Sequence, residues 1–330
     1  MSARGLGWLA AVVVLAAVAV GSVLIGTQEV GPNDVLDTWL RPDGSDAQRV
    51  VEYLRVPRTL VGLLAGAGLG VAGAMLQGLT RNPLAGPEVI GVNAGAALAV
   101  VVGISVFGVR TIGGWVWFAF AGAAVTGVGV YALASLGRGG ATPVKLALAG
   151  AAAAALLGGL TTATTLLDIT TFTSYRFWSV GALTSADAAV IRTALPFFAV
   201  GAGLAVLSAR SLDAMALGDD LARSLGQRLV FGRLMAGTGI VVLAGTAVAI
   251  AGPIAFVGLT VPHAARALVG PTHRWLLLYS AVLGPTVLLV ADVLGRVIAR
   301  PLELQAGIVT ALAGAPFFIA LVRRRRLVEL

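Results

Sequence analysis

The sequence contains no cysteine, one lysine and two histidines among its 330 residues. Without cysteine, disulfides, thiolate catalysis and cysteine-ligated metal sites are excluded. A nucleotide-binding P-loop ends in a Gly-Lys pair, whereas the single lysine, Lys145, follows Val144. His263 and His273 have no third ligand nearby, which argues against zinc, and neither an H-E-x-x-H motif nor a serine nucleophile elbow occurs. The sequence therefore predicts no enzyme, no cofactor and no metal site.

Charged residues are also scarce, at 12% of the chain, against about a quarter in soluble domains. Apolar residues make up 58% and form long blocks, so the bilayer is the expected solvent. The formal charge of +8 is carried almost entirely by arginine. In a membrane protein these charges set topology rather than bind nucleic acid. We expect an all-α integral membrane protein in the cell (plasma or inner) membrane, with multi-pass topology, lipid contacts and no nucleic-acid partner.

The apolar blocks predict about ten transmembrane helices within one domain, residues 1–330. The first is interpreted as a retained helix, although Ala17-Val18-Ala19 mimics a signal-cleavage site. An even number of spans places both termini on one side, and the arginine-rich tail assigns that side to the cytoplasm. A short interfacial helix is expected at 35–40. The expected spans are 8–25, 58–79, 88–107, 113–136, 144–167, 189–208, 229–250, a short helix within 252–270, 274–298 and 305–322.

The stretch 55–95 is the best defined part of the chain. Its apolar span carries small residues at spacings of three and four: Gly62, Gly66, Gly70 and Gly73. Such residues let neighbouring backbones approach closely in lipid. Pro83 and Pro87 cannot continue a helix. We therefore expect two membrane helices joined by a rigid hairpin.

The order R-x-P-R, Gln77, R-N-P-L-A-x-P and I-G-V-x-x-G-A in this stretch resembles the FecCD-type permeases. These are the membrane subunits of type II ATP-binding-cassette (ABC) importers for iron-siderophores, haem or vitamin B12. Residues 252–266 resemble the family's G-x-I-x-F-V-G-L-x-x-P-H-x-x-R, and 291–296 its A-D-x-x-x-R. The likeness covers nearly the whole chain and implies a vitamin B12 importer-like permease fold. It implies these structural motif residues: Gln77, Asn82, Pro83, Pro262, His263 and Asp292.

Two local interpretations accompany that resemblance. For His263, a hydrogen-bonded packing role at a helix break is preferred to catalysis or metal binding. Gln305-Ala306 stands where the family usually has Leu-Pro, which changes the start of the last helix locally.

Residues 210–228 are the least membrane-like part of the second half, and two short helices joined at Gly218 are expected there. Asp219 and Asp220 suit the start of a helix, and Gly226 suits its end. Taken alone, this is a solvated amphipathic loop. The resemblance implies instead a cytoplasmic coupling loop that contacts an ATPase subunit through Leu217, Gly218, Ala222, Leu225 and Gly226.

The resemblance also makes Arg55, Arg58 and Arg296 outward-facing positions that pair with acidic residues of a substrate-binding protein. Exposed arginines steer an acidic partner and fix its register; anchoring to lipid headgroups is the alternative. Asp292 and Arg296 lie on one helix face. A local ion pair is expected there, and a proton relay is the alternative.

Helix 144–167 and the following segment are expected to line a translocation path, with Thr161, Thr164 and Thr165 offering weak hydrogen bonds. The alternative is that these hydroxyls bond to their own helix carbonyls. The resemblance places Thr142 near a cytoplasmic gate, in a loop that matches the family poorly.

Together these features predict a permease subunit of an ABC importer, most plausibly for ferric siderophores, with haem or cobalamin as alternatives. It would form half of a dimeric pore with the same or a sister permease chain. Two ATPase subunits and an extracytoplasmic substrate-binding protein are the expected partners. A proton-driven secondary transporter that uses Asp292 as its relay is the competing class.

Overall fold

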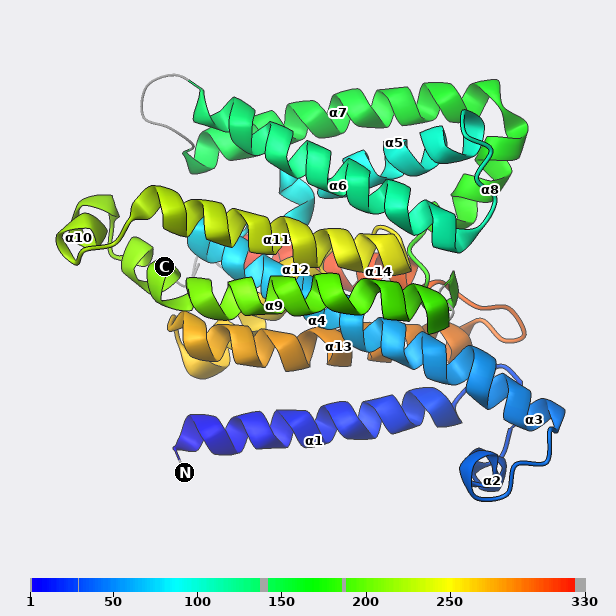
Figure 1. The fold of residues 1–330 in the computed structure, drawn as a ribbon. Helices are drawn as coiled ribbons and strands as arrows, with labels where there is room; N and C mark the ends of the chain where they lie inside the picture. Colours follow the sequence, from blue (N-terminus) through cyan, green and yellow to red (C-terminus); the bar gives the residue numbers. More distant parts are fainter. Residues whose placement is uncertain (1, 29, 137–141, 186–187, 324–330) are drawn as a thin grey trace.

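The computed structural model describes residues 2–28, 30–136, 142–185 and 188–323 (Figure 1). The described residues form helices and connecting turns, without strands. Ten helices correspond to the predicted spans: α1 Ala3–Leu24, α4 Val56–Thr80, α5 Val92–Ser105, α6 Ile112–Ser135, α7 Pro143–Leu167, α9 Ala188–Ala216, α11 Leu229–Ala251, α12 Val257–Val269, α13 His273–Ile298 and α14 Ala306–Arg323. The remaining elements are short: α2 Pro32–Leu40, α3 Asp46–Arg49, a π-helical turn Val50–Arg55, a 3-10 turn Pro87–Ile90, α8 Ile169–Ser179, a 3-10 turn Leu183–Ser185 and α10 Asp219–Ser224.

The predicted all-α membrane fold is confirmed. Seven helices of the described chain are long and apolar enough to cross a membrane, and α5 and α14 are shorter apolar helices. Three helix bounds differ from the prediction by more than two residues. α1 begins at Ala3 instead of 8, α5 begins at Val92 instead of 88, and α9 continues to Ala216 instead of ending at 208. The extra turns bury Leu212 and Met215 against the core, so packing extends the helix beyond the hydrophobic block.

Helix α4 is the centre of the bundle. It packs against α13, α11, α12 and α9, and most of its residues are buried. The small-residue face makes this possible. A Cβ atom on Gly66 would lie 2.5 Å from the Cα of Pro285, and one on Gly73 would lie 1.8 Å from the carbonyl oxygen of Gly258. The predicted close approach of backbones is therefore confirmed.

Helices α5 and α12 are half-length, and both begin deep inside the bundle. A Cβ atom on Gly258 would lie 2.5 Å from Cδ of Pro87, so the turn before α5 lies against the start of α12. In these two irregular segments the Gly91 N–H donates to the Glu88 carbonyl at 3.0 Å, and the Val257 N–H donates to the Ala255 carbonyl at 2.9 Å. Irregular backbone inside a membrane requires such internal partners. The predicted hairpin is held in the same way, because the Leu84 N–H donates to Asn82 Oδ1 at 3.0 Å.

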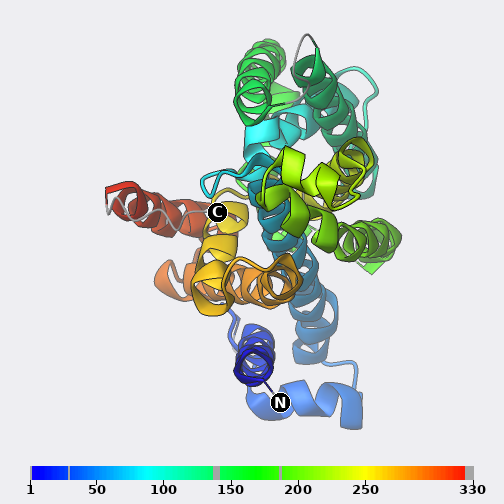
Figure 2. The same cartoon turned by 90° about the vertical axis from the view of Figure 1, so that its left-hand side faces the viewer.

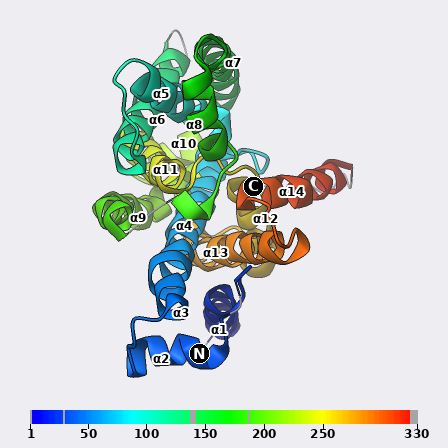
Figure 3. The same cartoon turned by 90° about the vertical axis from the view of Figure 1, so that its right-hand side faces the viewer.

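The other helices surround this centre unevenly. α5, α6, α7 and α8 form a lobe at the top of Figure 1. α14 projects from the body, as the two end-on views show (Figures 2 and 3), and α1 lies along α13. The N-terminus, the described end of α14 and α10 lie at the same end of the bundle (Figure 1). That end is the one predicted to be cytoplasmic, and its assignment stays a prediction.

Candidate functional site

The first candidate surface is the helix α10 with its two flanking turns. Gly218 (φ 107°) and Gly226 (φ 78°) adopt left-handed conformations that favour glycine, and they set the helix off from α9 and α11. Leu221 of α10 and Leu217 and Leu225 of its two flanking turns are each more than half exposed. Of the two short helices expected around Gly218, the first is the end of α9 and the second is α10. An exposed apolar face of this kind is typical of a protein contact.

A buried alanine and an ion-pair cluster hold the other side of α10. Ala222 is fully buried. Asp219 lies between two arginines: Arg233 of α11 donates to its Oδ2 at 2.6 Å, and Arg81 at the end of α4 donates to its Oδ1. Burial favours a higher pKa for Asp219, but the hydrogen bonds from Arg233 and Arg81 outweigh it and hold the pKa below its ordinary value. α10 is thus fixed to the ends of two membrane helices.

A second link joins the same region to α13. Both the backbone N–H and the ring Nδ1 of His273 lie 2.8 Å from Asp213 Oδ1, near the end of α9. The ring also packs on α4, since a Cβ atom on Gly78 would lie 2.1 Å from its Nε2. Sequence reasoning missed both acids as anchors. Their partners lie far along the chain, so only the presence of unexplained acids in a basic loop could have indicated them.

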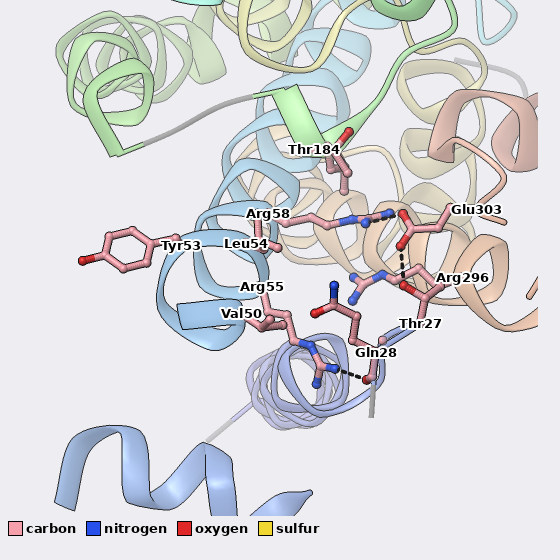
Figure 4. A pocket seen from close by; sticks show the side chains of 12 residues that line it. Thr27, Gln28, Val50, Tyr53, Leu54, Arg55, Arg58, Thr184, Arg296 and Glu303 are labelled. Carbon is pink, nitrogen blue, oxygen red and sulfur yellow. Dashed lines mark hydrogen bonds and ion pairs between the residues drawn. The ribbon is translucent and has the colours of Figure 1, made fainter. Parts of the chain in front are cut away.

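At the opposite end of the bundle, Asp292 is enclosed by guanidinium groups. Arg58 donates to it through Nε and Nη2 at 2.7–3.1 Å and to Glu303 through Nη1 at 2.6 Å. Arg296 donates to Asp292 Oδ2 from the next turn of α13. The expected local ion pair between Asp292 and Arg296 is present and is part of a larger cluster. Figure 4 shows Arg58 and Arg296 converging beside Glu303.

The three arginines expected to be exposed are buried. Arg55, Arg58 and Arg296 have 4%, 7% and 1% of their surface exposed, so the expectation of exposed side chains was wrong. Two of them donate hydrogen bonds to free carbonyls at the end of α1. Arg55 donates to the carbonyls of residues 23, 24 and 28, and Arg296 donates to those of residues 22 and 25, at 2.7–3.0 Å.

The physical reason is the set of carbonyls that a helix end leaves without partners. Inside a membrane protein these carbonyls need donors, and the two guanidinium groups supply them. The arginines also border a cavity of about 200 Å³ lined by Thr27, Tyr53, Thr184 and Glu303, among others (Figure 4). Burial favours a higher pKa for Glu303, but hydrogen bonds from Arg58 and Thr27 hold the pKa below its usual value. The docking role of the three arginines stays a prediction.

The threonines of α7 bond to their own helix. The hydroxyls of Thr161, Thr164 and Thr165 donate to carbonyls four residues earlier at 2.8–2.9 Å, which is the back-bonding alternative. Thr161 and Thr165 nevertheless line a hollow between α5, α7 and α8, together with Asn93 and Arg176. Their role in a path is untested. Thr142 accepts a hydrogen bond from the Lys145 N–H at the start of α7; most of its loop, 137–141, lies outside the described residues.

The motif residues of α4 and α12 form a buried polar contact. Gln77 is fully buried; its Nε2 donates to the Leu259 carbonyl at 3.1 Å, and its Oε1 accepts from Arg266 at 3.0 Å. Pro262 is buried within α12.

His263 packs edge-on against the Phe317 ring, with centroids 6.2 Å apart. Among the described residues, the buried Nδ1 of His263 has no hydrogen-bond partner, so the expected hydrogen bond is absent at that nitrogen and the packing contact is present. In the part of the chain that the structure describes, no three metal-ligating side chains come together.

The fold defines a polytopic α-helical membrane protein in which ion pairs fix the short helix α10 at one end of the bundle. The sequence profile of the FecCD transport family matches residues 12–324, so the chain belongs to that family. The resemblance noted from the motifs is confirmed, as is the multi-pass location in the cell membrane.

Two curated relatives and one solved structure illustrate the match. The chain is 43% identical over 302 residues to the Fe(3+)-citrate import system permease protein YfmD of Bacillus subtilis, covering 92% of this chain and 90% of the relative. It is 44% identical over 304 residues to the ferric enterobactin transport system permease protein FepD of Escherichia coli, covering 92% and 91%. A structure of an inward-facing metal-chelate type ABC transporter superimposes with a TM-score of 0.83 at 27% identity, covering 97% of this chain and 99% of that one.

Proposed function

We propose that this chain is the translocation subunit of an ATP-driven importer of ferric siderophores. The single observation that carries the proposal is the exposed apolar face of α10, held rigidly by the ion pairs of Asp219. Relatives named for ferric citrate and ferric enterobactin support a ferric chelate as cargo. Haem and cobalamin are the alternative cargoes.

The chain works with separate subunits. Its one lysine does not end a P-loop, so two partner ATPase subunits hydrolyse the ATP. One docks on α10 of each permease chain, and two such chains, identical or sister, enclose the path. ATPase closure moves α10, and the contacts through Asp219 and Asp213 pass this motion to α4, α11 and α13 as rigid bodies.

The opposite end of the bundle receives a substrate-binding protein. The cavity of Figure 4 is lined by Arg55, Arg58, Arg296 and Glu303. Asp292 pairs with Arg58 and Arg296, and Glu303 pairs with Arg58. Three guanidinium groups and two carboxylates leave an excess of one positive charge. An uncompensated positive charge attracts acidic groups of a partner even from below the surface. The arginines act in docking in two ways. They supply this positive field, and they hold the end of α1 in the position in which the partner meets it.

A reconstituted system tests the proposal. The chain is co-purified with its ATPase and any sister permease and is placed in liposomes. The binding protein is supplied with ferric enterobactin, ferric citrate or haem labelled with radioactive iron, or with cobalamin labelled with radioactive cobalt. We expect uptake that requires ATP and a ferric chelate. Uptake of haem or cobalamin alone would show that the proposed cargo is wrong, while the proposed class of transporter would stand.

A proton-driven transporter is the outcome that would overturn the proposal. It predicts uptake without ATP that follows a proton gradient and disappears in Asp292→Asn. The geometry gives little support to Asp292 as a proton relay, because both of its oxygens accept hydrogen bonds from Arg58 or Arg296.

A further inference from the structure

A pocket of about 250 Å³ lies between α4, α6, α7 and α11, in the half of the bundle that carries α10. No role assigned above involves it. Its floor is apolar and buried and is formed by Leu76, Ile90, Leu146 and Ile240. A dry cavity with such walls accommodates an apolar molecule in preference to water.

The mouth of the pocket opens sideways. Val128 of α6 and Leu234 of α11 line it, with 66% and 49% of their surface exposed. Both helices lie on the side of the molecule away from the projecting α14 (Figure 2). Exposed apolar side chains on spanning helices face acyl chains in a membrane, so the bilayer has direct access to the pocket.

One end of the pocket is polar. Tyr131 lies four residues before the end of α6, and Arg233 lies four residues after the start of α11. Both therefore lie near the membrane surface, where tyrosine and arginine contact headgroups. Among the described residues, Asp219 is the one hydrogen-bond partner of the Arg233 guanidinium, through a single nitrogen. The remaining N–H donors match the oxygens of a phosphate.

We propose that this pocket binds one acyl chain of an anionic phospholipid from the leaflet on the α10 side, with the phosphate held by Arg233 and Tyr131. The inference rests on the membrane location of the chain and not on its cargo. Because Arg233 also holds Asp219, the bound lipid contacts the same guanidinium that fixes α10. A change in the anionic lipid content of the membrane would therefore change how firmly Arg233 holds α10.

Gly237 offers a way to fill the pocket without disturbing the fold. It lines the pocket, and a Cβ atom added there meets nothing within 4 Å. Gly129 on α6 also has open space around an added Cβ atom but does not line the pocket. Gly237→Leu and Gly129→Leu are therefore a matched pair.

The experiment measures lipid binding to the purified full-length chain by native mass spectrometry. The probes are dioleoyl phosphatidylglycerol, dioleoyl phosphatidylcholine and glycerol 3-phosphate. We expect the phosphatidylglycerol to bind tightly to the wild type and to Gly129→Leu, and at least tenfold more weakly to Gly237→Leu. Arg233→Gln is expected to lose the preference for phosphatidylglycerol over phosphatidylcholine. Equal binding to the two leucine variants would overturn the proposal, and binding of glycerol 3-phosphate alone would show a free-phosphate site instead.

A second measurement on the wild type covers the case in which a variant does not fold. Phosphatidylglycerol with a photoreactive group in its acyl chain is cross-linked in nanodiscs, and the modified peptides are mapped. Labelling concentrated within 124–131 of α6 and 234–242 of α11 is expected. Labelling spread evenly over the exposed faces of α1 and α9 would contradict a defined site.

Discussion

At the scale of single residues, the network around Asp292 shows that the burial of an arginine cannot be predicted from its neighbours in the sequence alone. The pattern R-x-P-R predicted basic residues at a surface, whereas the structure gives each guanidinium internal acceptors. Arg58 has two carboxylates, and Arg55 and Arg296 have the carbonyls at the end of α1. The pair of Arg296 with Asp292 could be predicted from their spacing of four. The partners of Arg58 could not, because Asp292 and Glu303 lie more than two hundred residues beyond it.

Removing the charge of the Asp292 carboxylate is the sharpest test at this scale. Asp292→Asn leaves two buried guanidinium groups without their shared counter-charge, and breaking a buried pair in this way costs about 3–5 kcal/mol. We expect a clearly lowered Tm for the full chain in detergent, read by intrinsic fluorescence. Asp46→Asn is the control, because its pair with Arg49 is solvent-exposed and such pairs contribute at most about 1 kcal/mol. Equal losses in both variants would exclude the structural role of the cluster.

At the scale of elements, most helices could be predicted from the sequence because long apolar blocks are the dominant signal in a membrane protein. The ends that failed are those set by tertiary contacts. α9 runs on to Ala216 because its last turns pack on the core, and the polar stretch after α7 contains the unpredicted helix α8. The anchoring of α10 was not predictable either, since Arg81 and Asp219 are 138 residues apart.

The glycine face of α4 gives a prediction for an element as a whole. Gly73→Ala places a methyl group against the Gly258 carbonyl. No side chain can rotate away to relieve this clash, so α4 and the segment at Gly258 must move apart. We expect a loss of about 1–3 kcal/mol, typical of overpacking, measured as a shift of the unfolding midpoint. Gly158→Ala on α7 is the matched control: it meets open space and is expected to be neutral, or stabilising by up to about 1 kcal/mol from helix propensity. The idea fails if both variants unfold alike.

The link between α10 and the membrane helices also has a defined pH dependence. Asp219 has its pKa held low, since hydrogen bonds from Arg233 and Arg81 outweigh burial. A group whose folded pKa is depressed adds stability that is present above its unfolded pKa and lost as the pH falls through the folded value. Melting curves should therefore separate wild type from Asp219→Asn at neutral pH and through mild acid, and converge only in strong acid. A difference that instead vanishes between about pH 8 and 6 would contradict the assigned ion pairs.

At the scale of the whole molecule, two helices carry side chains of the polar networks at both ends of the bundle. α4 carries Arg58 at one end and Arg81 at the other, and α13 carries Asp292 and His273 in the same way. These two helices are also packed together along their length. A shift imposed at α10 therefore reaches the cavity of Figure 4 without any flexible connection between them. The separate contacts could be seen only in the structure, whereas the family and the ten spans could be predicted from the sequence.

The contacts from α10 to α4 and α11 predict which step of transport each change at α10 will impair. Leu225→Asp places a charge in the exposed apolar face and should weaken docking of the ATPase, whereas Asp219→Asn leaves that face intact and loosens α10 from α4 and α11. In the reconstituted importer we expect Leu225→Asp to lose both co-purified ATPase and iron uptake. Asp219→Asn should retain the ATPase and its ATP hydrolysis while uptake per ATP falls several-fold. Asp220→Asn is the control, because Asp220 is exposed and, among the described residues, pairs with Arg223 alone, within α10. If Asp219→Asn left uptake per ATP unchanged, transmission through the Asp219 ion pairs would be ruled out, and the contact of Asp213 with His273 would be left as the route from α9 to α13.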